Sequence, residues 1–366
     1  MSASWSHVRR MLCNKCAALG IPVSGVFELT PRCNLRCKMC YVRLTPEQMH
    51  PLGRERTAEE WLELARQARD QGMTFLLLTG GEPTLRTDFC RIYEALAQMG
   101  LSISLNTNGT LLTPEIRRLW SKLPPAQVNI TLYGTCREDY DALCGNPDAF
   151  DAVVDGLDWL KAQGILVHLN TTIVPTNRKK WEEIEVFAKK RGLDLRMTVY
   201  CFPPNRRDCS GFERLQPEDA GQLIVQDTLY REGIQSILNR AEDLDKPLPK
   251  SCELDNGEPM QCTAGKSQFW ITWNGKMSPC AMLTKPATEP FGKDFATAWE
   301  ELKGLCDAIR LCPDCVDCPD QKSCMNCAAV TFAETGHFDG KPEYMCRLNR
   351  AYREELFRIA KEYSRT

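Results

Sequence analysis

Residues 25–40, GVFELTPRCNLRCKMC, join a run that is typical of a buried strand to three closely spaced cysteines. Short apolar runs of this kind recur as far as residue 200, and segments with the pattern of amphipathic helices separate them. Six strands, each followed by a helix, predict a parallel sheet with right-handed crossovers. The candidate strands are residues 25–29, 74–79, 101–107, 127–133, 165–174 and 193–200.

Helix boundaries in this region are well marked. Thr57 and Glu60 have the spacing of a capping box, and Thr113 precedes a proline that suits the first turn of a helix. Gly164 and Gly192 follow the ends of two later helices. Because a closed barrel of the common type needs eight units, the six units predict an α/β fold, a partial (β/α)6 TIM-like barrel.

The composition favours a metal protein of the cytoplasm. The chain has 366 residues, a net charge of −2 and 20 cysteines. The balanced charge gives no support to a surface that binds nucleic acid or coats a membrane. The N-terminus lacks the apolar core of a signal peptide, and no segment has about 18 uninterrupted apolar residues. Since cytosolic thiols stay reduced, metal sites explain the cysteines better than disulfides, which would require a targeting signal.

The cysteines are clustered, with three at 33–40 and nine between 262 and 346. Residues 268–280 have the pattern of a hairpin with Asn274-Gly275 as a two-residue turn. The expected organisation is an N-terminal extension (1–24), the barrel (25–216), a helix and linker (217–251), a cysteine-rich domain (252–347) and a C-terminal helix (348–366).

Cys33, Cys37 and Cys40 directly follow the first predicted strand. They therefore belong at the edge where the carboxyl ends of parallel strands gather and ligands bind. Three thiolates on a four-iron cluster leave the fourth iron open to a further ligand. The alternative is a zinc knuckle whose fourth ligand lies elsewhere in the chain.

A second motif, Gly80-Gly81-Glu82-Pro83, ends the second strand. Two glycines allow a close approach of the backbone, and a carboxylate can pair with an ammonium group. With C-x3-C-x2-C one β/α unit earlier, the sequence resembles the radical S-adenosylmethionine (radical SAM) superfamily. The resemblance implies that the amino and carboxylate groups of S-adenosylmethionine chelate the open iron of a [4Fe–4S] cluster. Reductive cleavage would then give methionine and a 5′-deoxyadenosyl radical, which abstracts a hydrogen atom from the substrate.

The resemblance also implies contacts to S-adenosylmethionine. The element Gly80–Pro83 matches the family's binding element for the methionyl amine. The polar residues after the third strand are placed for the ribose or the carboxylate, unless they form a plain Asn-Gly turn. Met39 stands where the family often has an aromatic residue beside adenine, and Tyr41 follows it. The cofactor-binding candidates are Gly80, Gly81, Glu82, Pro83, Asn106, Thr107, Asn108 and Tyr41.

The C-terminal cysteines resemble the seven-cysteine SPASM extension of radical SAM enzymes, which binds two auxiliary [4Fe–4S] clusters. Two structural zinc sites are the alternative. Cys306 and Cys312 are additional, and Cys13 with Cys16 forms a further C-x2-C pair of unassigned role. The resemblance assigns Cys262, Cys280, Cys327 and, as a candidate fourth ligand, Cys252 to one cluster, and Cys315, Cys318, Cys324 and Cys346 to the other.

SPASM enzymes chiefly modify peptides and proteins, by crosslinking, thioether formation, epimerisation or oxidation to formylglycine. Ala281 replaces the Asp that serves formylglycine-forming enzymes as a base, which disfavours that reaction here. We therefore expect a radical SAM oxidoreductase that modifies a peptide or protein, with a flavodoxin or ferredoxin as electron donor. The alternatives are a radical SAM dehydrogenase acting on a small molecule and a non-catalytic iron–sulfur electron carrier.

Three polar residues in the predicted strands, Glu28, Arg196 and Tyr200, are candidates to face a substrate inside the barrel. Only 24 residues precede the first strand, too few for the winged-helix module with which many peptide maturases hold a leader peptide. This leaves three options: a separate leader-binding partner, direct binding of the peptide at the barrel mouth, or a small substrate.

Overall fold

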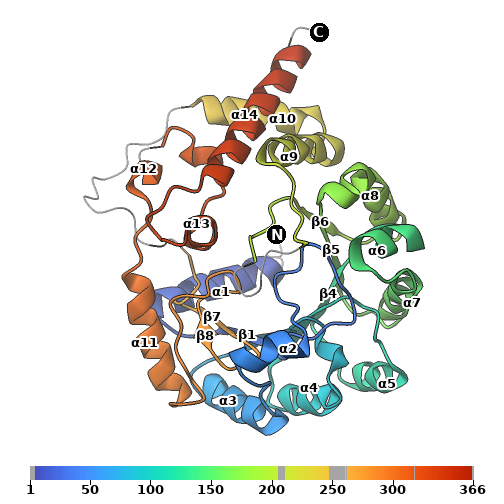
Figure 1. Ribbon diagram of the computed structural model, residues 1–366, viewed down its shortest axis with the longest axis vertical. Coiled ribbons are helices and arrows are strands. Elements are labelled where there is room, and N and C mark those ends of the chain that lie inside the picture. The colour runs from blue at the N-terminus through green and yellow to red at the C-terminus, as the bar shows by residue number, and fades with distance from the viewer. Residues whose placement is uncertain (1–4, 205–210, 247–259, 261, 317, 365–366) are drawn as a thin grey trace.

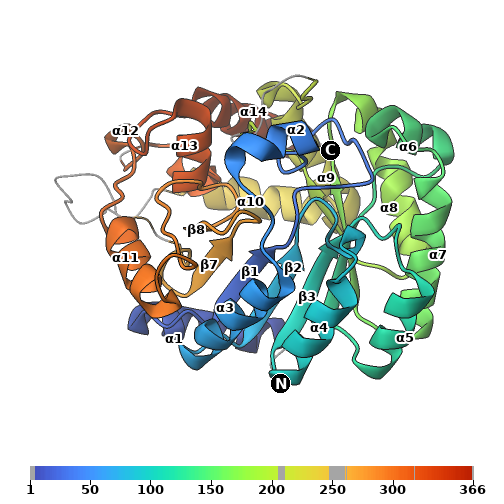
Figure 2. The same ribbon diagram turned by 60° about the horizontal axis from the view of Figure 1, so that its bottom comes forward.

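The computed structural model describes residues 5–204, 211–246, 260, 262–316 and 318–364. In this part of the chain one eight-stranded sheet forms the centre of the molecule, in the order β6-β5-β4-β3-β2-β1-β7-β8 (Figures 1 and 2). The strands are β1 (Ser24–Glu28), β2 (Phe75–Thr79), β3 (Ser102–Thr107), β4 (Gln127–Thr131), β5 (Val167–Thr172), β6 (Leu195–Thr198), β7 (Gln268–Ile271) and β8 (Met277–Ser278).

The predicted α/β fold is confirmed. Each of the six predicted strands is present and overlaps its expected range, and β1 to β6 pair in parallel with their neighbours. The sheet remains a partial TIM-like barrel. Strand β7 pairs in parallel with the free edge of β1, with Ser24 opposite Gln268, and β8 then pairs antiparallel with β7. The hairpin therefore extends the barrel sheet.

Helices surround the outer side of this sheet (Figure 1). The predicted capping box is present, because Glu60 N donates to Thr57 Oγ1 (3.2 Å) and Thr57 N donates to Glu60 Oε2 (2.8 Å). The helices of the described residues are α1 (Trp5–Leu19), α2 (Pro46–Met49), α3 (Ala58–Asp70), α4 (Phe89–Gln98), α5 (Pro114–Lys122), α6 (Arg137–Cys144), α7 (Ala149–Ala162), α8 (Trp181–Lys190), α9 (Pro217–Glu232), α10 (Ile234–Asp245), α11 (Phe295–Asp307), α12 (Pro313–Val316), α13 (Ala328–Thr335) and α14 (Glu343–Tyr363).

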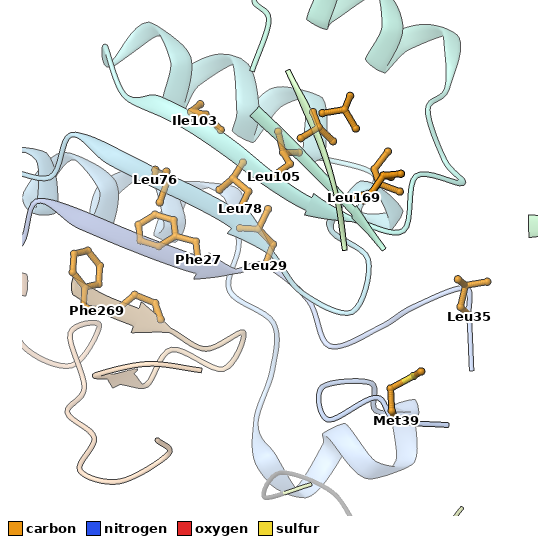
Figure 3. Close-up of a cluster of buried hydrophobic side chains, with 14 of the residues drawn as sticks. Phe27, Leu29, Leu35, Met39, Leu76, Leu78, Ile103, Leu105, Leu169 and Phe269 are labelled. Atoms are coloured by element: carbon orange, nitrogen blue, oxygen red, sulfur yellow. The ribbon is translucent and has the colours of Figure 1, made fainter. Parts of the chain in front are cut away.

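The two faces of the sheet differ in polarity. Along β3, β4 and β5 the residues alternate strictly between buried and partly exposed positions. Apart from Thr107 and Thr171, the buried positions are apolar and pack into the main core, as Figure 3 shows for Ile103, Leu105 and Leu169 beside Leu76 and Leu78 of β2. Because successive side chains of a strand point to opposite faces, the partly exposed positions all line the inner side of the barrel.

The hairpin turn is longer than predicted. Thr272 N donates to Lys276 O (2.9 Å) and Gly275 N donates to Thr272 O (2.8 Å), so residues 273–275 form a three-residue loop. Gly275 has a φ of 95°, which a residue with a side chain rarely adopts. The expected two-residue turn at Asn274-Gly275 is therefore wrong. Strand pairing at Ile271 and Met277 ends before the chain reaches that dipeptide.

Helices α11, α13 and α14 lie on the opposite side of the molecule from α5 and α7 (Figure 1). Helix α14 packs along α9 and α10, with Val225, Ile237, Leu356 and Ile359 buried between them. It begins at Glu343, so Cys346 lies in its first turn. Within the described residues, we find no helix whose length and apolar content would let it cross a membrane.

Candidate functional site

A pocket of about 340 Å³ lies at the carboxyl ends of the strands, where parallel α/β folds bind their ligands. Three segments meet there: the cysteine loop after β1, the Gly-Gly loop after β2 and the turn after β3. The three cysteines thus lie at the carboxyl ends of the strands, as their position after the first strand predicted. The predicted residues that line it are Cys33, Cys37, Cys40, Tyr41, Gly80, Gly81, Asn106, Thr107, Asn108 and Tyr200.

Main-chain N–H groups point at two of the three thiols of the cysteine loop. Leu35 N donates to Cys33 Sγ (3.4 Å), and Arg43 N donates to Cys40 Sγ (3.3 Å). Such donors stabilise negative charge on sulfur and are one means by which proteins tune iron–sulfur clusters. Three partly exposed thiols around one pocket, with N–H donors behind them, fit the ligand set of a cluster.

The thiols differ in their electrostatic surroundings. Burial raises the pKa of the Cys33 thiol to about 12, against the opposing effect of the Leu35 N–H group. A thiolate at this position needs a positive partner in the pocket, which a bound iron atom would provide. By contrast, a hydrogen bond from Cys144, helped by Tyr133, lowers the pKa of Cys37. Cys144 is fully buried at the end of α6. No feature of the sequence distinguished it from the other scattered cysteines.

Glycine is required at positions 80 and 81 because the main chains of two loops approach each other closely there. A Cβ atom at Gly80 would lie 2.4 Å from Thr30 O, and one at Gly81 would lie 2.4 Å from Arg32 O. Gly81 N donates to Thr30 O (2.7 Å), and Glu82 N donates to Arg32 O (2.8 Å). The Gly-Gly loop is thus fixed against the start of the cysteine loop, and its main chain faces the pocket.

The carboxylate of Glu82 points into the protein. It is fully buried and accepts four hydrogen bonds, from Thr84 N (3.1 Å), Thr84 Oγ1 (2.5 Å), Thr107 Oγ1 (2.8 Å) and Asn108 N (2.7 Å). Burial raises the pKa of this carboxyl group, and the donors oppose that shift. The Glu82 side chain does not line the pocket, and its pairing with an ammonium group stays a prediction. It ties the Gly-Gly loop to the turn after β3.

Asn34, Asn108 and Thr110 form a closed ring of side-chain hydrogen bonds. Asn108 Nδ2 donates to Asn34 Oδ1 (2.8 Å), Asn34 Nδ2 to Thr110 Oγ1 (2.8 Å), and Thr110 Oγ1 to Asn108 Oδ1 (2.7 Å). Asn108 Nδ2 also donates to Cys33 Sγ over 3.7 Å. The ring fastens the cysteine loop to the turn after β3.

Two further contacts hold the other half of the cysteine loop. Arg36 N donates to Cys144 O (2.8 Å), which joins the loop to the end of α6. The ammonium group of Lys38 pairs with Glu213 (2.9 Å) and donates to Thr176 Oγ1 (3.1 Å), which follows β5. The loop is thereby held from several sides of the barrel mouth.

The three substrate-facing candidates lie in different surroundings. Glu28 is fully buried and accepts a hydrogen bond from Trp270 Nε1 (3.1 Å). Arg196 is exposed on β6 and does not line the pocket. Tyr200 lines the pocket, and its hydroxyl group donates to Glu334 Oε1 (2.6 Å). Among the three, Tyr200 is thus the one that the fold brings to the thiols.

Tyr200 belongs to a polar network that joins the pocket to the C-terminal helices. Arg214 pairs with the Glu334 carboxylate of α13 through both Nη atoms (2.6 and 3.3 Å). The guanidinium group also lies 4.0 Å from the centroid of the Tyr344 ring of α14. Tyr344 in turn packs edge-on against Tyr200, with 5.5 Å between ring centroids. Arg214 and Glu334 carry no motif, and only the fold reveals them.

The C-terminal thiols gather in two groups. In the first, burial raises the pKa of the Cys280 thiol, and the nearby thiols of Cys327 and Cys262 add to the shift. Cys306 lies close to the same group, since Cys280 and Cys262 contribute to the raised pKa of Cys306, about 12, after burial itself. Cys252, the candidate fourth ligand, lies outside the described residues.

In the second group, burial raises the pKa of Cys315 to about 12, and Cys312, Cys346 and Cys324 add to the shift. Cys318 and Cys346 similarly affect the pKa of Cys324, after burial. The partition of these thiols between two clusters stays a prediction, and Cys312 lies near Cys315 in the second group.

No three Cys, His, Asp or Glu side chains of the described chain are close enough together to share a single metal ion. A tetrahedral zinc site would require four ligands within about 2.3 Å of one ion. A four-iron cluster separates its thiolates more widely, because each thiolate binds a different iron. The support for a cluster at the barrel mouth therefore comes from the three thiols themselves and from the N–H groups that donate to Cys33 and Cys40.

The protein is thus a TIM-like α/β protein with a partial barrel. Its candidate ligand site is the thiol-lined pocket at the barrel mouth. The Radical SAM superfamily model matches residues 27–189, which run from β1 into α8 and include both the cysteine loop and the Gly-Gly loop. Residues 27–189 therefore form a radical SAM domain, and the chain is similar to radical SAM enzymes.

The chain is similar to several characterised members. It is 27% identical over 340 residues to the AdoMet-dependent heme synthase of Methanosarcina barkeri, covering 85% of this chain and 93% of that protein. It is 25% identical to the subtilosin biosynthesis protein AlbA of Bacillus subtilis, over 77% of this chain and 59% of that protein. The fold matches Streptococcus suis SuiB bound to S-adenosylmethionine with a TM-score of 0.64 at 18% identity, over 94% of this chain and 82% of that one.

Proposed function

We propose that this radical SAM enzyme binds its cluster through Cys33, Cys37 and Cys40, binds S-adenosylmethionine in the adjoining pocket, and modifies a peptide. The observation that carries the cofactor assignment is the convergence of three thiols and a glycine main chain on one pocket. When bound, a cluster and S-adenosylmethionine supply an electron and, by reductive cleavage, a radical that removes a hydrogen atom from the substrate.

The protein groups have separate tasks in this proposal. The main chain of Gly80 and Gly81 binds the methionyl amine, since their side of the loop faces the pocket and the Glu82 carboxylate does not. Tyr41 and Met39 line the pocket and provide the walls for adenine. Asn108 supports the cluster through Cys33, in addition to lining the pocket.

We further assign one auxiliary [4Fe–4S] cluster to each group of C-terminal thiols. Support comes from the proximity of Cys280 to Cys262 and Cys327, and from the gathering of the second set around Cys315. Cys306 is a further candidate ligand of the first cluster because it lies near Cys280 and Cys262. Three four-iron clusters would give about twelve irons per chain after anaerobic reconstitution.

The inner face of the barrel favours a peptide as substrate. Its partly exposed positions carry amide, hydroxyl and imidazole groups, where a closed barrel would be filled with branched apolar side chains. A peptide backbone presents N–H and C=O groups that need such partners when bound. A flat apolar macrocycle would instead favour apolar and aromatic walls, which Met39, Tyr133 and Phe202 provide at the barrel mouth. The positions on β3 to β5 are Ser102, Ser104, Asn106, Gln127, Asn129, Thr131, His168, Asn170 and Thr172, of which Asn106, Thr131 and Thr172 line the pocket at the barrel mouth.

Two comparisons agree with this choice. AlbA serves, by its name, the biosynthesis of a bacteriocin. SuiB, whose fold this chain shares, was also solved with its precursor peptide SuiA bound. The match to the heme synthase along 93% of that protein favours a second candidate, an iron tetrapyrrole.

One experiment separates the two candidates. The reconstituted enzyme is incubated anaerobically with S-adenosylmethionine, a reductant, and either the short peptides encoded beside this gene or an iron porphyrin that carries propionates. The proposal expects a mass change in a peptide, with deuterium moving from the labelled peptide into 5′-deoxyadenosine. A change in the porphyrin alone would replace the peptide by the tetrapyrrole as substrate.

A further inference from the structure

A second cavity, of about 560 Å³, lies at the opposite end of the barrel, where the strands begin. Helix α1 forms one wall, and the first residues of β2 to β5 and β7 form the others. In Figure 2, α1 lies at the lower end of the molecule, and the arrows of β1 and β3 point away from it. This end of a TIM-like barrel usually serves stability, so an open cavity here calls for an explanation.

The cavity wall carries positive charge. Arg9 and Arg10 of α1 line it, and no Asp or Glu is found among its lining residues in the described chain. Neither arginine has a carboxylate partner within 4.0 Å in the part of the chain that the structure describes. The guanidinium group of Arg9 lies 4.7 Å from the centroid of the Phe75 ring, and Arg10 Nη2 lies 3.4 Å from His7 Nδ1. Arg9 also forms a hydrogen bond with the Cys13 thiol, and since a guanidinium group has five N–H donors, both arginines retain donors for an anion.

The remaining wall supplies neutral polar groups. Ser104, Gln127 and His168 are the lower inner-face residues of β3, β4 and β5, and all three line the cavity. Phe75, at the start of β2, adds an apolar surface. The cavity thus combines two permanent positive charges, several hydrogen-bonding groups and one aromatic wall.

We propose that this cavity binds a small organic anion, whose carboxylate or phosphate group is held by Arg9 and Arg10 while its apolar part contacts Phe75. The planar guanidinium group binds both kinds of oxyanion through paired hydrogen bonds. The volume lies within the range of about 300–1,000 Å³ that is usual for small-molecule sites. A five-residue strand separates the two ends of the barrel by roughly 15–20 Å, so the anion does not overlap the pocket at the barrel mouth.

The test is isothermal titration of the full-length reconstituted protein with citrate and, separately, with inorganic phosphate, each at constant ionic strength. The two titrations distinguish a carboxylate from a phosphate ligand. We expect binding of at least one anion, unchanged by saturating S-adenosylmethionine, and a loss of affinity of tenfold or more in the double variant Arg9→Gln/Arg10→Gln. The matched control is Arg66→Gln/Arg69→Gln on α3, which removes the same charge from an exposed surface and should leave binding unchanged.

A second variant tests the cavity without changing α1, in case the arginine substitutions disturb that helix. Gln127→Glu places a carboxylate in the opposite wall without altering the helix, and it should also weaken binding at least tenfold. Absence of heat with both anions at 10 mM would overturn the proposal. Equal affinity in the arginine variant and the wild type, or equal loss in the control variant, would overturn it as well. Reductive cleavage of S-adenosylmethionine should continue in the arginine variant, because the cavity lies at the other end of the barrel.

Discussion

Asn108 Nδ2 donates both to Asn34 Oδ1 (2.8 Å) and to Cys33 Sγ (3.7 Å). One amide group thus joins the turn after β3 to the first thiol of the cysteine loop. Thr110 closes the ring from the other side, so the amide is held in one orientation. If Cys33 binds a cluster, Asn108 supports a ligand and also influences the charge on its sulfur.

We predict that Asn108→Ala lowers the reduction potential of the cluster at the barrel mouth. A hydrogen bond to a ligating sulfur favours the reduced state, and its loss removes that stabilisation. Cluster retention should also weaken, by about 10–100-fold in affinity. Potentiometry followed by electron paramagnetic resonance measures the potential, using the signal that changes when S-adenosylmethionine is added. Asn239→Ala, on the exposed face of α10, is the control. An unchanged potential in Asn108→Ala would contradict the assigned contact.

Glu82 should be important for stability, since its buried carboxylate satisfies donors of Thr84, Thr107 and Asn108. Glu82→Ala leaves these donors unsatisfied, and we expect a loss of about 2–5 kcal/mol in the free energy of unfolding. Glu82→Gln keeps one acceptor oxygen and should cost less. Urea denaturation of the metal-free proteins gives both values. The account fails here if the two variants unfold at the wild-type midpoint.

The hydroxyl group of Tyr200 and the carboxylate of Glu334 should be energetically coupled, because 2.6 Å separates their oxygens. We predict a coupling of about 0.5–3 kcal/mol in a double-mutant cycle of Tyr200→Phe and Glu334→Gln. Denaturant unfolding of the wild type, both single variants and the double variant provides the four free energies. Additive effects would mean that the barrel mouth and α13 are not joined through this contact.

Lys38 fastens the cysteine loop through Glu213 and Thr176. Its side chain is 39% exposed and that of Glu213 is 30% exposed, so the ion pair should add only about 0–1 kcal/mol to global stability. Its effect should be local. In Lys38→Met we expect faster hydrogen exchange at the amides of Arg36 and Lys38, with little change elsewhere.

Lys180→Met is the matched control, because Lys180 pairs with Glu183 on an exposed helix away from the pocket. Exchange at Arg36 and Lys38 should keep its wild-type rate in that variant. Equal rates in Lys38→Met and the wild type would show that the clamp does not restrain the loop.

The strands could be predicted because each one carries a local pattern of apolar residues between turn residues. The parallel pairing of β7 with β1 could not, since it joins Gln268 to Ser24 across most of the chain. The hairpin turn was misjudged for a related reason. Asn274-Gly275 specifies a turn, but the pairing of Ile271 with Met277 decides how long the loop is.

In the site, too, local motifs could be predicted from the sequence, and contacts between distant residues could not. Cys33, Cys37, Cys40 and the glycine pair stand in short local motifs, and the fold brings them to one pocket as expected. The direction of the Glu82 side chain depends on donors 25 and 26 residues later, which no local motif reveals. The contact between Cys144 and Cys37 likewise exists only because α6 returns to the cysteine loop.

The central claim is that Cys33, Cys37 and Cys40 hold the cluster that cleaves S-adenosylmethionine. Its most direct test is the yield of 5′-deoxyadenosine from the anaerobically reconstituted, reduced protein, compared with the triple variant Cys33→Ala/Cys37→Ala/Cys40→Ala. The account predicts cleavage by the wild type and none by the variant, which should lose about four irons and keep those of the C-terminal thiols. Cleavage by the triple variant at the wild-type rate would contradict the assignment.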